Sequence, residues 1–222
     1  MINRGFKIKR KNFYGVIFDF DGVLAETVEG NFLVWRQVLA KYKIFLTKLE
    51  YCLLEGMSPI NIARAILKSR RLPLTVAEEI AMEKDRLYLK TRNFRLYPEA
   101  LVLIKKFKNK GIPMAIVSGA SRQRFFKTFP KGLAKDFSVI ITADLATKPK
   151  PNPQGFKLAV RKMSLQAKNC LVVENAPLGV LAAKRAGCFC VAVLTSLEKK
   201  YLQQADLVFK DLKTLNSQIL FV

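Results

Sequence analysis

The chain has 222 residues, a formal net charge of +22 and no histidine. Because the imidazole side chain is missing, histidine metal sites and Ser-His-Asp or Cys-His catalysis are excluded. Hydrophobic residues make up 50% of the chain and charged residues 25%, which is typical of a folded globular protein and excludes the disordered and fibrous classes. Any chemistry must therefore depend on carboxylates, amines, hydroxyls or a metal ion.

The basic charge predicts attraction to anionic partners, such as phosphorylated metabolites or, nonspecifically, polyanions like nucleic acid. The 39 basic residues are dispersed, and no stretch interleaves them with aromatic residues as a single-strand binding platform would. We interpret most of this charge as a basic surface. The sequence predicts no oligomeric state.

Apolar runs such as residues 101–104 and 188–194 are far shorter than the roughly 20 residues of a membrane-spanning helix. The basic N-terminal segment is not followed by the hydrophobic stretch of a signal peptide. We therefore expect a cytoplasmic protein without a membrane span. The cysteines lack a Cys-x-x-Cys spacing and stand in apolar stretches, which predicts buried thiols. They are Cys52, Cys170, Cys188 and Cys190.

Short, apolar, β-prone runs alternate with segments of helical spacing. The predicted strands are residues 14–18, 112–117, 139–142, 170–173, 188–194 and 207–209. The predicted helices between them are residues 98–110, 122–129, 153–163 and 177–186. Gly111 and Gly187 follow two of these helices and supply left-handed C-terminal caps. This alternation predicts an α/β fold with a Rossmann-like parallel sheet, whose ligands bind beyond the carboxyl ends of the strands.

One long stretch breaks the alternation, because residues 29–93 contain only amphipathic helical segments. These segments are residues 31–42, 59–68 and 77–91. We interpret residues 28–94 as a helical cap domain inserted into a core formed by residues 1–27 and 95–222. The insert follows the first strand directly, so it is expected to overhang the site at that strand's end and to exclude water.

Two carboxylates follow the first predicted strand, in the run Asp19-Phe20-Asp21-Gly22. Such a pair can share a divalent cation, while one acid attacks a substrate and the other transfers its proton. A polar turn after a strand is the alternative. The apolar strand before the pair and Thr27 at a fixed distance after it favour the functional interpretation.

This pattern resembles the haloacid dehalogenase-like (HAD) hydrolase superfamily, and later segments are similar to its further motifs. Ser118, after the second strand, matches the hydroxyl that binds the transferring phosphoryl group. Lys150, in Lys-Pro-Asn-Pro, matches the ammonium that balances phosphate and carboxylate charge. Lys148 begins an overlapping Lys-Pro-Lys-Pro, but Phe156 fits only the register of Lys150.

Glu174 and Asn175 follow a strand at the place where the fourth motif of the family carries acidic metal ligands. Asn175 stands where the family usually has Asp, which removes one negative charge and should weaken Mg²⁺ binding. Asn is also a favoured helix N-cap before a Pro at the first helical position, here Pro177. A capping role is therefore open beside the metal role.

The resemblance implies a Mg²⁺-dependent phosphatase that acts on a small phosphorylated substrate, such as a sugar phosphate or a phosphoglycolate-like metabolite. Asp19 would attack phosphorus to give an aspartyl phosphate, and Asp21 would act as acid and then as base. Ser118, Lys150 and Mg²⁺ would neutralise the negative charge on the phosphoryl oxygens during transfer. The implied metal ligands are Asp19, the main-chain carbonyl of Asp21, Glu174 and Asn175.

Within the superfamily, Asp21 favours phosphate esters, because the dehalogenases and phosphonate hydrolases lack this acid. The helical cap, Trp35 and the run Gly56-Met57-Ser58 resemble the β-phosphoglucomutase and phosphoglycolate phosphatase branch. In the mutase a cap histidine and an arginine assist catalysis, and here Asn31 and Pro59 stand in their places. We therefore expect a phosphatase. The alternatives are a sugar phosphomutase and a catalytically weakened basic binding protein on the same fold.

Four further side chains of the predicted cap and its junction are interpreted structurally. Trp35 is expected to be a core or hinge aromatic residue, as is Tyr97. Lys84 and Lys90 are expected on a solvated helix face.

Overall fold

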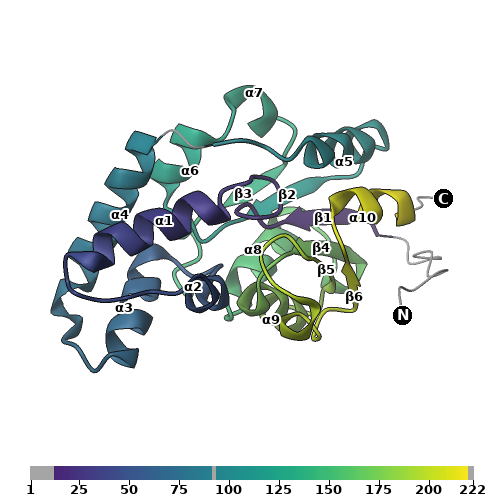
Figure 1. Cartoon of the computed structure of the whole chain (residues 1–222). Helices are drawn as coiled ribbons and strands as arrows, with labels where there is room; N and C mark the ends of the chain where they lie inside the picture. Colours follow the sequence, from purple (N-terminus) through teal and green to yellow (C-terminus); the bar gives the residue numbers. More distant parts are fainter. Residues whose placement is uncertain (1–12, 92–93, 220–222) are drawn as a thin grey trace.

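A six-stranded sheet forms the centre of the computed structural model, which describes residues 13–91 and 94–219 (Figure 1). The strands are β1 (Gly15–Phe18), β2 (Met114–Val117), β3 (Val139–Ile141), β4 (Cys170–Glu174), β5 (Phe189–Val193) and β6 (Leu207–Phe209). Their order is β3-β2-β1-β4-β5-β6, and all neighbouring strands are parallel. The predicted Rossmann-like α/β fold is confirmed, and all six predicted strands are present with ends shifted by at most two residues.

Helices cover both faces of this sheet. Val16 and Phe18 of β1 pack on one face in a cluster with α5, α6 and α10, whereas Ile17 packs on the other face with α8 and α9. The helices are α5 (Pro98–Asn109), α6 (Arg122–Thr128), α8 (Gln154–Lys162), α9 (Pro177–Arg185) and α10 (Leu212–Gln218), with the short α7 (Lys131–Ala134) beside them. Burial on both faces explains why the strands are continuous apolar runs instead of alternating ones.

Residues 28–91 form a helical insert with its own hydrophobic cluster, which includes Trp35, Leu39 and Ile80. Its helices are α1 (Val28–Ala40), α2 (Lys48–Leu54), α3 (Pro59–Ser69) and α4 (Ala77–Thr91). Figure 1 shows them together at the left of the view, on the opposite side from α5 and α10. The division into a cap at residues 28–94 and a core at residues 1–27 and 95–222 stays an interpretation, and residues 1–12, 92–93 and 220–222 lie outside the described part.

Helix α2 was absent from the predicted elements, although its start carries a recognisable signal. Thr47 and Glu50 form a capping box, in which each side chain accepts a hydrogen bond from the other residue's main-chain N–H. After the C-terminal ends of α5 and α9, Gly111 and Gly187 take positive φ angles of 66° and 83°, as predicted. The four cysteines are buried free thiols, also as predicted. Among the residues described, no helix combines the length and apolar character that crossing a membrane requires.

Candidate active site

Three adjacent strands bring most of the predicted site residues together. Asp19 follows β1, Ser118 follows β2, Glu174 is the last residue of β4 and Asn175 comes next. Since β1 lies between β2 and β4, the carboxyl ends of these strands meet at one edge of the sheet. The strand order reverses direction between β1 and β4, which is where ligands bind in doubly wound sheets.

Lys150 enters this edge from the loop between β3 and α8. Its Nζ lies 2.5 Å from Asp19 Oδ1 and 2.6 Å from Glu174 Oε1, and it also donates to the Val117 carbonyl at 3.3 Å. Burial raises the pKa of Asp19 to about 8, although the Lys150 ammonium opposes the shift. Burial would lower the pKa of Lys150, but the two carboxylates outweigh it and keep this side chain charged. Lys148 is exposed, in agreement with the register chosen from Phe156.

Both carboxylate oxygens of Glu174 have partners. Oε1 faces Lys150, and Oε2 accepts the main-chain N–H groups of Asn175 at 2.9 Å and Ala176 at 3.1 Å. Gly179 makes room for this carboxylate, because a Cβ there would lie 1.8 Å from Oε1. The N-cap residue of α9 is Ala176, so the capping alternative for Asn175 is wrong.

The Asn175 side chain is fully buried and forms hydrogen bonds with one residue of the core and one residue of the helical insert. Its Nδ2 donates to Ser196 Oγ at 3.0 Å and to Glu55 Oε2 at 3.4 Å. Its Oδ1 is buried and has no hydrogen-bond partner. Gly22, at a φ of 84°, leaves space for this amide, since a Cβ there would lie 2.2 Å from Nδ2. An unpartnered buried carbonyl oxygen is costly, and a hard cation would satisfy it.

The donor set fits a magnesium ion. Among residues 13–91 and 94–219, no three His, Cys, Asp or Glu side chains are grouped so as to hold a metal ion by themselves. A bound cation would therefore depend on amide and main-chain oxygens as well as carboxylates. The Asp19 carboxylate, the Asp21 carbonyl and Asn175 Oδ1 are the hard oxygen donors that suit Mg²⁺. Glu174 borders this set, although its oxygens are already engaged.

Arg124 on α6 holds the second carboxylate of the motif in place. Its Nη1 and Nη2 lie 3.1 and 2.7 Å from the two oxygens of Asp21, and Thr27 Oγ1 donates to Oδ1 at 2.6 Å. Burial tends to raise the pKa of Asp21, but Arg124 outweighs it, so the pKa lies below its usual value. Arg124 was not among the predicted site residues, because nothing in the sequence distinguishes it from the basic residues Arg122 and Lys127 on the same short helix.

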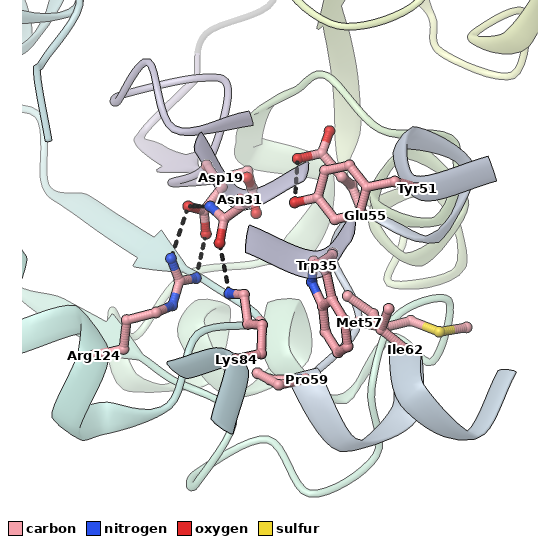
Figure 2. A pocket seen from close by; sticks show the side chains of 13 residues that line it. Asp19, Asn31, Trp35, Tyr51, Glu55, Met57, Pro59, Ile62, Lys84 and Arg124 are labelled. Atoms are coloured by element: carbon pink, nitrogen blue, oxygen red, sulfur yellow. Dashed lines mark hydrogen bonds and ion pairs between the residues drawn. The ribbon is translucent and has the colours of Figure 1, made fainter. Parts of the chain in front are cut away.

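Lys84 on α4 is buried, with 2% of its surface exposed, so the predicted solvated position is wrong. Its Nζ donates to Asn31 Oδ1 at 2.6 Å, and Asn31 Nδ2 donates to Asp21 Oδ1 at 3.2 Å. Figure 2 shows the Lys84 ammonium pointing at the Asn31 amide, with Arg124 beside it. Burial lowers the pKa of Lys84 to about 8, with a further contribution from the Arg124 charge. Ile80, Lys84 and Tyr88 are all buried, and their i, i+4 spacing was the available signal.

A small cavity lies between the helical insert and the strand ends (Figure 2). Glu55 lines it from the loop after α2, is 3% exposed and accepts a hydrogen bond from the Tyr51 hydroxyl at 3.3 Å. Burial raises the pKa of Glu55 well above its usual value, and the charges of Asp21 and Asp19 add to the shift. Trp35 also borders the cavity and is buried, as predicted. Nothing in the local sequence marked Glu55, since it stands outside every motif.

The cavity has a volume of about 30 Å³, which is room for about two water molecules. A phosphate ester does not fit in this space. We therefore expect the helical insert to move away from the sheet to admit a substrate and, on its return, to exclude water from the site.

Comparison with known proteins identifies the family. The model of the haloacid dehalogenase-like hydrolases matches residues 16–193. The bifunctional riboflavin kinase/FMN phosphatase of Arabidopsis thaliana is 31% identical over 202 residues, which cover 89% of this chain and 53% of that protein. The β-phosphoglucomutase of Bacillus subtilis is 29% identical, and the match covers 92% of each protein. The chain spans about half the length of two of the curated relatives that it matches.

A solved structure of a hydrolase from Pseudomonas syringae has the same fold. Its TM-score is 0.84 at 23% sequence identity, with 91% of this chain and 96% of that chain covered. The chain belongs to the haloacid dehalogenase-like hydrolase family, as the motif resemblance predicted. Within the family it falls in the branch of the β-phosphoglucomutases and related small-molecule phosphatases.

Proposed function

We propose that the chain is a Mg²⁺-dependent phosphatase that hydrolyses a small phosphorylated metabolite, such as a sugar phosphate or a phosphoglycolate-like ester. The observation that carries the proposal is the placement of two carboxylates around one cavity. Asp19 stands at the end of β1 beside Lys150, and Asp21, two residues later, is held at the same cavity by Arg124. One acid is thereby placed for attack and the other for proton transfer.

In the proposed reaction, a free oxygen of Asp19 attacks phosphorus and forms an aspartyl phosphate while the alkoxide leaves. Ser118 and the main-chain N–H groups after β2 would bind the phosphoryl oxygens, and Lys150 would neutralise part of their charge. Water then attacks the aspartyl phosphate and releases inorganic phosphate. Asp21 would protonate the leaving oxygen in the first step and accept the proton of water in the second.

The metal would lie among Asp19, the Asp21 carbonyl and Asn175, with Glu174 at its border. Mg²⁺ bound there would supply charge stabilisation for the phosphoryl group as it is transferred. Lys150 also contributes positive charge: burial opposes its charged form, but its two carboxylate neighbours outweigh burial and raise its pKa.

The contact between Asp21 and Arg124 has a consequence for the first step. In this closed arrangement Asp21 is held in its ionised form, which suits a base and not an acid. To donate a proton to the leaving group, Asp21 must loosen its bond to Arg124. Movement of the helical insert with substrate is a means to do so, because Asp85 of α4 also lies 3.9 Å from Arg124 Nε.

The mutase activity of some relatives is the alternative, and the site supports it less well. A mutase must retain the phosphoryl group and return it to the sugar, and the resemblance assigns part of that control to a cap histidine. Asn31 stands at this place and bonds to Asp21 and Lys84. A carboxamide cannot exchange a proton near neutral pH, so it cannot take over a histidine's role.

The test is a screen of the purified chain against phosphorylated sugars, phosphoglycolate and other small esters, with release of inorganic phosphate as the readout. We expect hydrolysis of at least one ester that stops when EDTA is added and returns when Mg²⁺ is restored. Transfer of phosphate to a new position on the product would favour the mutase instead. No hydrolysis of any ester with Mg²⁺ present would contradict the proposed function.

A further inference from the structure

Three consecutive residues of the helical insert rest directly on the site. A Cβ at Gly56 would lie 2.8 Å from Lys150 Cδ, and a Cβ at Gly119, after β2, would lie 2.5 Å from the Met57 carbonyl oxygen. The third residue is Glu55, whose carboxylate reaches the amide of Asn175. The insert therefore touches the segments that follow β2, β3 and β4 through one short loop.

The hydrogen bonds around Asn175 fix which way its carboxamide points. Ser196 Oγ donates to the main-chain carbonyl oxygen of Asn175 at 3.3 Å and accepts from Nδ2 at 3.0 Å. Glu55 Oε2 is the second acceptor for Nδ2. Turning the amide over would remove the Nδ2 donor from both contacts, and both hydrogen bonds would be lost as the structure has them. The observed orientation therefore places both amide N–H groups on Ser196 and Glu55 and leaves Oδ1 as the unpartnered atom.

We propose that Glu55 is a positioning residue for the metal site: it holds the Asn175 carboxamide across the boundary between insert and core, so that Oδ1 stays available as a Mg²⁺ ligand. The proposal rests on the proposed function, since Mg²⁺ is the cation it assumes. It adds that Glu55, a residue of the insert, sets the orientation of Asn175, a metal ligand in the core. Metal affinity then depends on closure of the insert.

Because Asn175 donates a hydrogen bond to Glu55, the effect of a substitution at either residue depends on the side chain at the other. An Asn175→Asp substitution alone replaces the Nδ2 donor by an oxygen, which would lie about as far from the Glu55 carboxylate as Nδ2 does now, at 3.4 Å. The amide donor that joins the two positions in the structure is then missing. Exchanging the groups, with Asn175→Asp and Glu55→Gln together, restores one donor and one acceptor and adds a carboxylate on the metal side.

The experiment measures Mg²⁺ binding to the full chain by calorimetry, with the Mg²⁺-induced rise in melting temperature as a second readout. Glu55→Met, which has no acceptor oxygen, should weaken Mg²⁺ binding by about tenfold or more, as expected for loss of a group that orients a metal ligand. Glu55→Gln keeps an acceptor oxygen and should bind within about threefold of the parent. Tyr51→Phe is the matched control, because it removes the other hydrogen bond of Glu55 and leaves Asn175 untouched.

Parent-like Mg²⁺ affinity of Glu55→Met would overturn the positioning role while leaving the phosphatase proposal intact. If Glu55→Met does not fold, the double variant with Asn175→Asp and Glu55→Gln provides the test of the positioning role. It should bind Mg²⁺ more tightly than Asn175→Asp alone. Equal affinities of those two variants would also overturn the role. A parent protein that binds no Mg²⁺ would overturn the positioning role together with the proposed metal dependence.

Discussion

Asp19→Asn is expected to lower turnover of any substrate by about 10⁴-fold or more, the scale seen when a nucleophile is removed from an enzyme. The amide is nearly isosteric with the carboxylate, but its oxygen is too weak a nucleophile to attack phosphorus. Initial rates of phosphate release with saturating Mg²⁺ provide the measurement. Turnover near the parent rate would contradict the assignment of Asp19 as nucleophile.

The same variant should keep its fold, which separates a chemical loss from a structural one. Burial disfavours the charged form of Asp19 and raises its pKa to about 8, so a neutral amide costs less to bury than the carboxylate. Lys150 retains Glu174 as a partner at 2.6 Å. We therefore expect a melting temperature close to that of the parent.

Asp21→Asn is expected to lower kcat by about 10²–10⁴-fold, the usual contribution of general acid–base catalysis. The amide can still accept a hydrogen bond from Arg124 but cannot transfer a proton to the leaving group or from water. Single-turnover rates and steady-state rates on the best substrate measure the loss. Glu198→Gln, which removes an exposed surface carboxylate, is the control and should leave kcat unchanged.

A loss smaller than about tenfold for Asp21→Asn would show that another group transfers the proton. Lys84 would then be the next residue to test, because its buried ammonium lies in the same cavity. Whether Asp21 or Lys84 is the general acid can be decided by comparing the rate loss of each variant on esters with different leaving groups. Loss of a general acid should be greatest for esters with poor leaving groups.

The sheet was predictable because burial on both faces leaves a clear pattern of short apolar runs. Asp19 directly follows β1 and Glu174 is the last residue of β4, and the adjacency of these strands follows from the doubly wound topology. The sequence predicts six site residues because each belongs to a motif. Five of them stand at strand ends and Lys150 stands in the loop after β3; the five are Asp19, Asp21, Ser118, Glu174 and Asn175. Several strand ends differ from the predicted ones by one or two residues, since hydrogen bonding and not composition sets where a strand stops.

The site residues outside the motifs were not predictable in the same way. Arg124, Glu55 and Lys84 reach the cavity through packing between segments distant in sequence, and their neighbours in the chain are ordinary. Lys84 could have been found, because it continues the buried stripe of Ile80 and Tyr88 on α4. Glu55 lies in a loop, where neither a period of 3.6 nor a period of 2 applies. Its role follows only from the hydrogen bond to Asn175.

The most direct test of the proposed chemistry is to trap the phosphorylated enzyme. The chain is mixed with Mg²⁺ and its best substrate, quenched in acid within one turnover and mapped by mass spectrometry. We expect a phosphoryl group on Asp19 in the parent, a larger amount in Asp21→Asn because its hydrolysis is slowed, and none in Asp19→Asn. Turnover without phosphorylation of Asp19, or a phosphoryl group on another residue such as Ser118, would contradict the account.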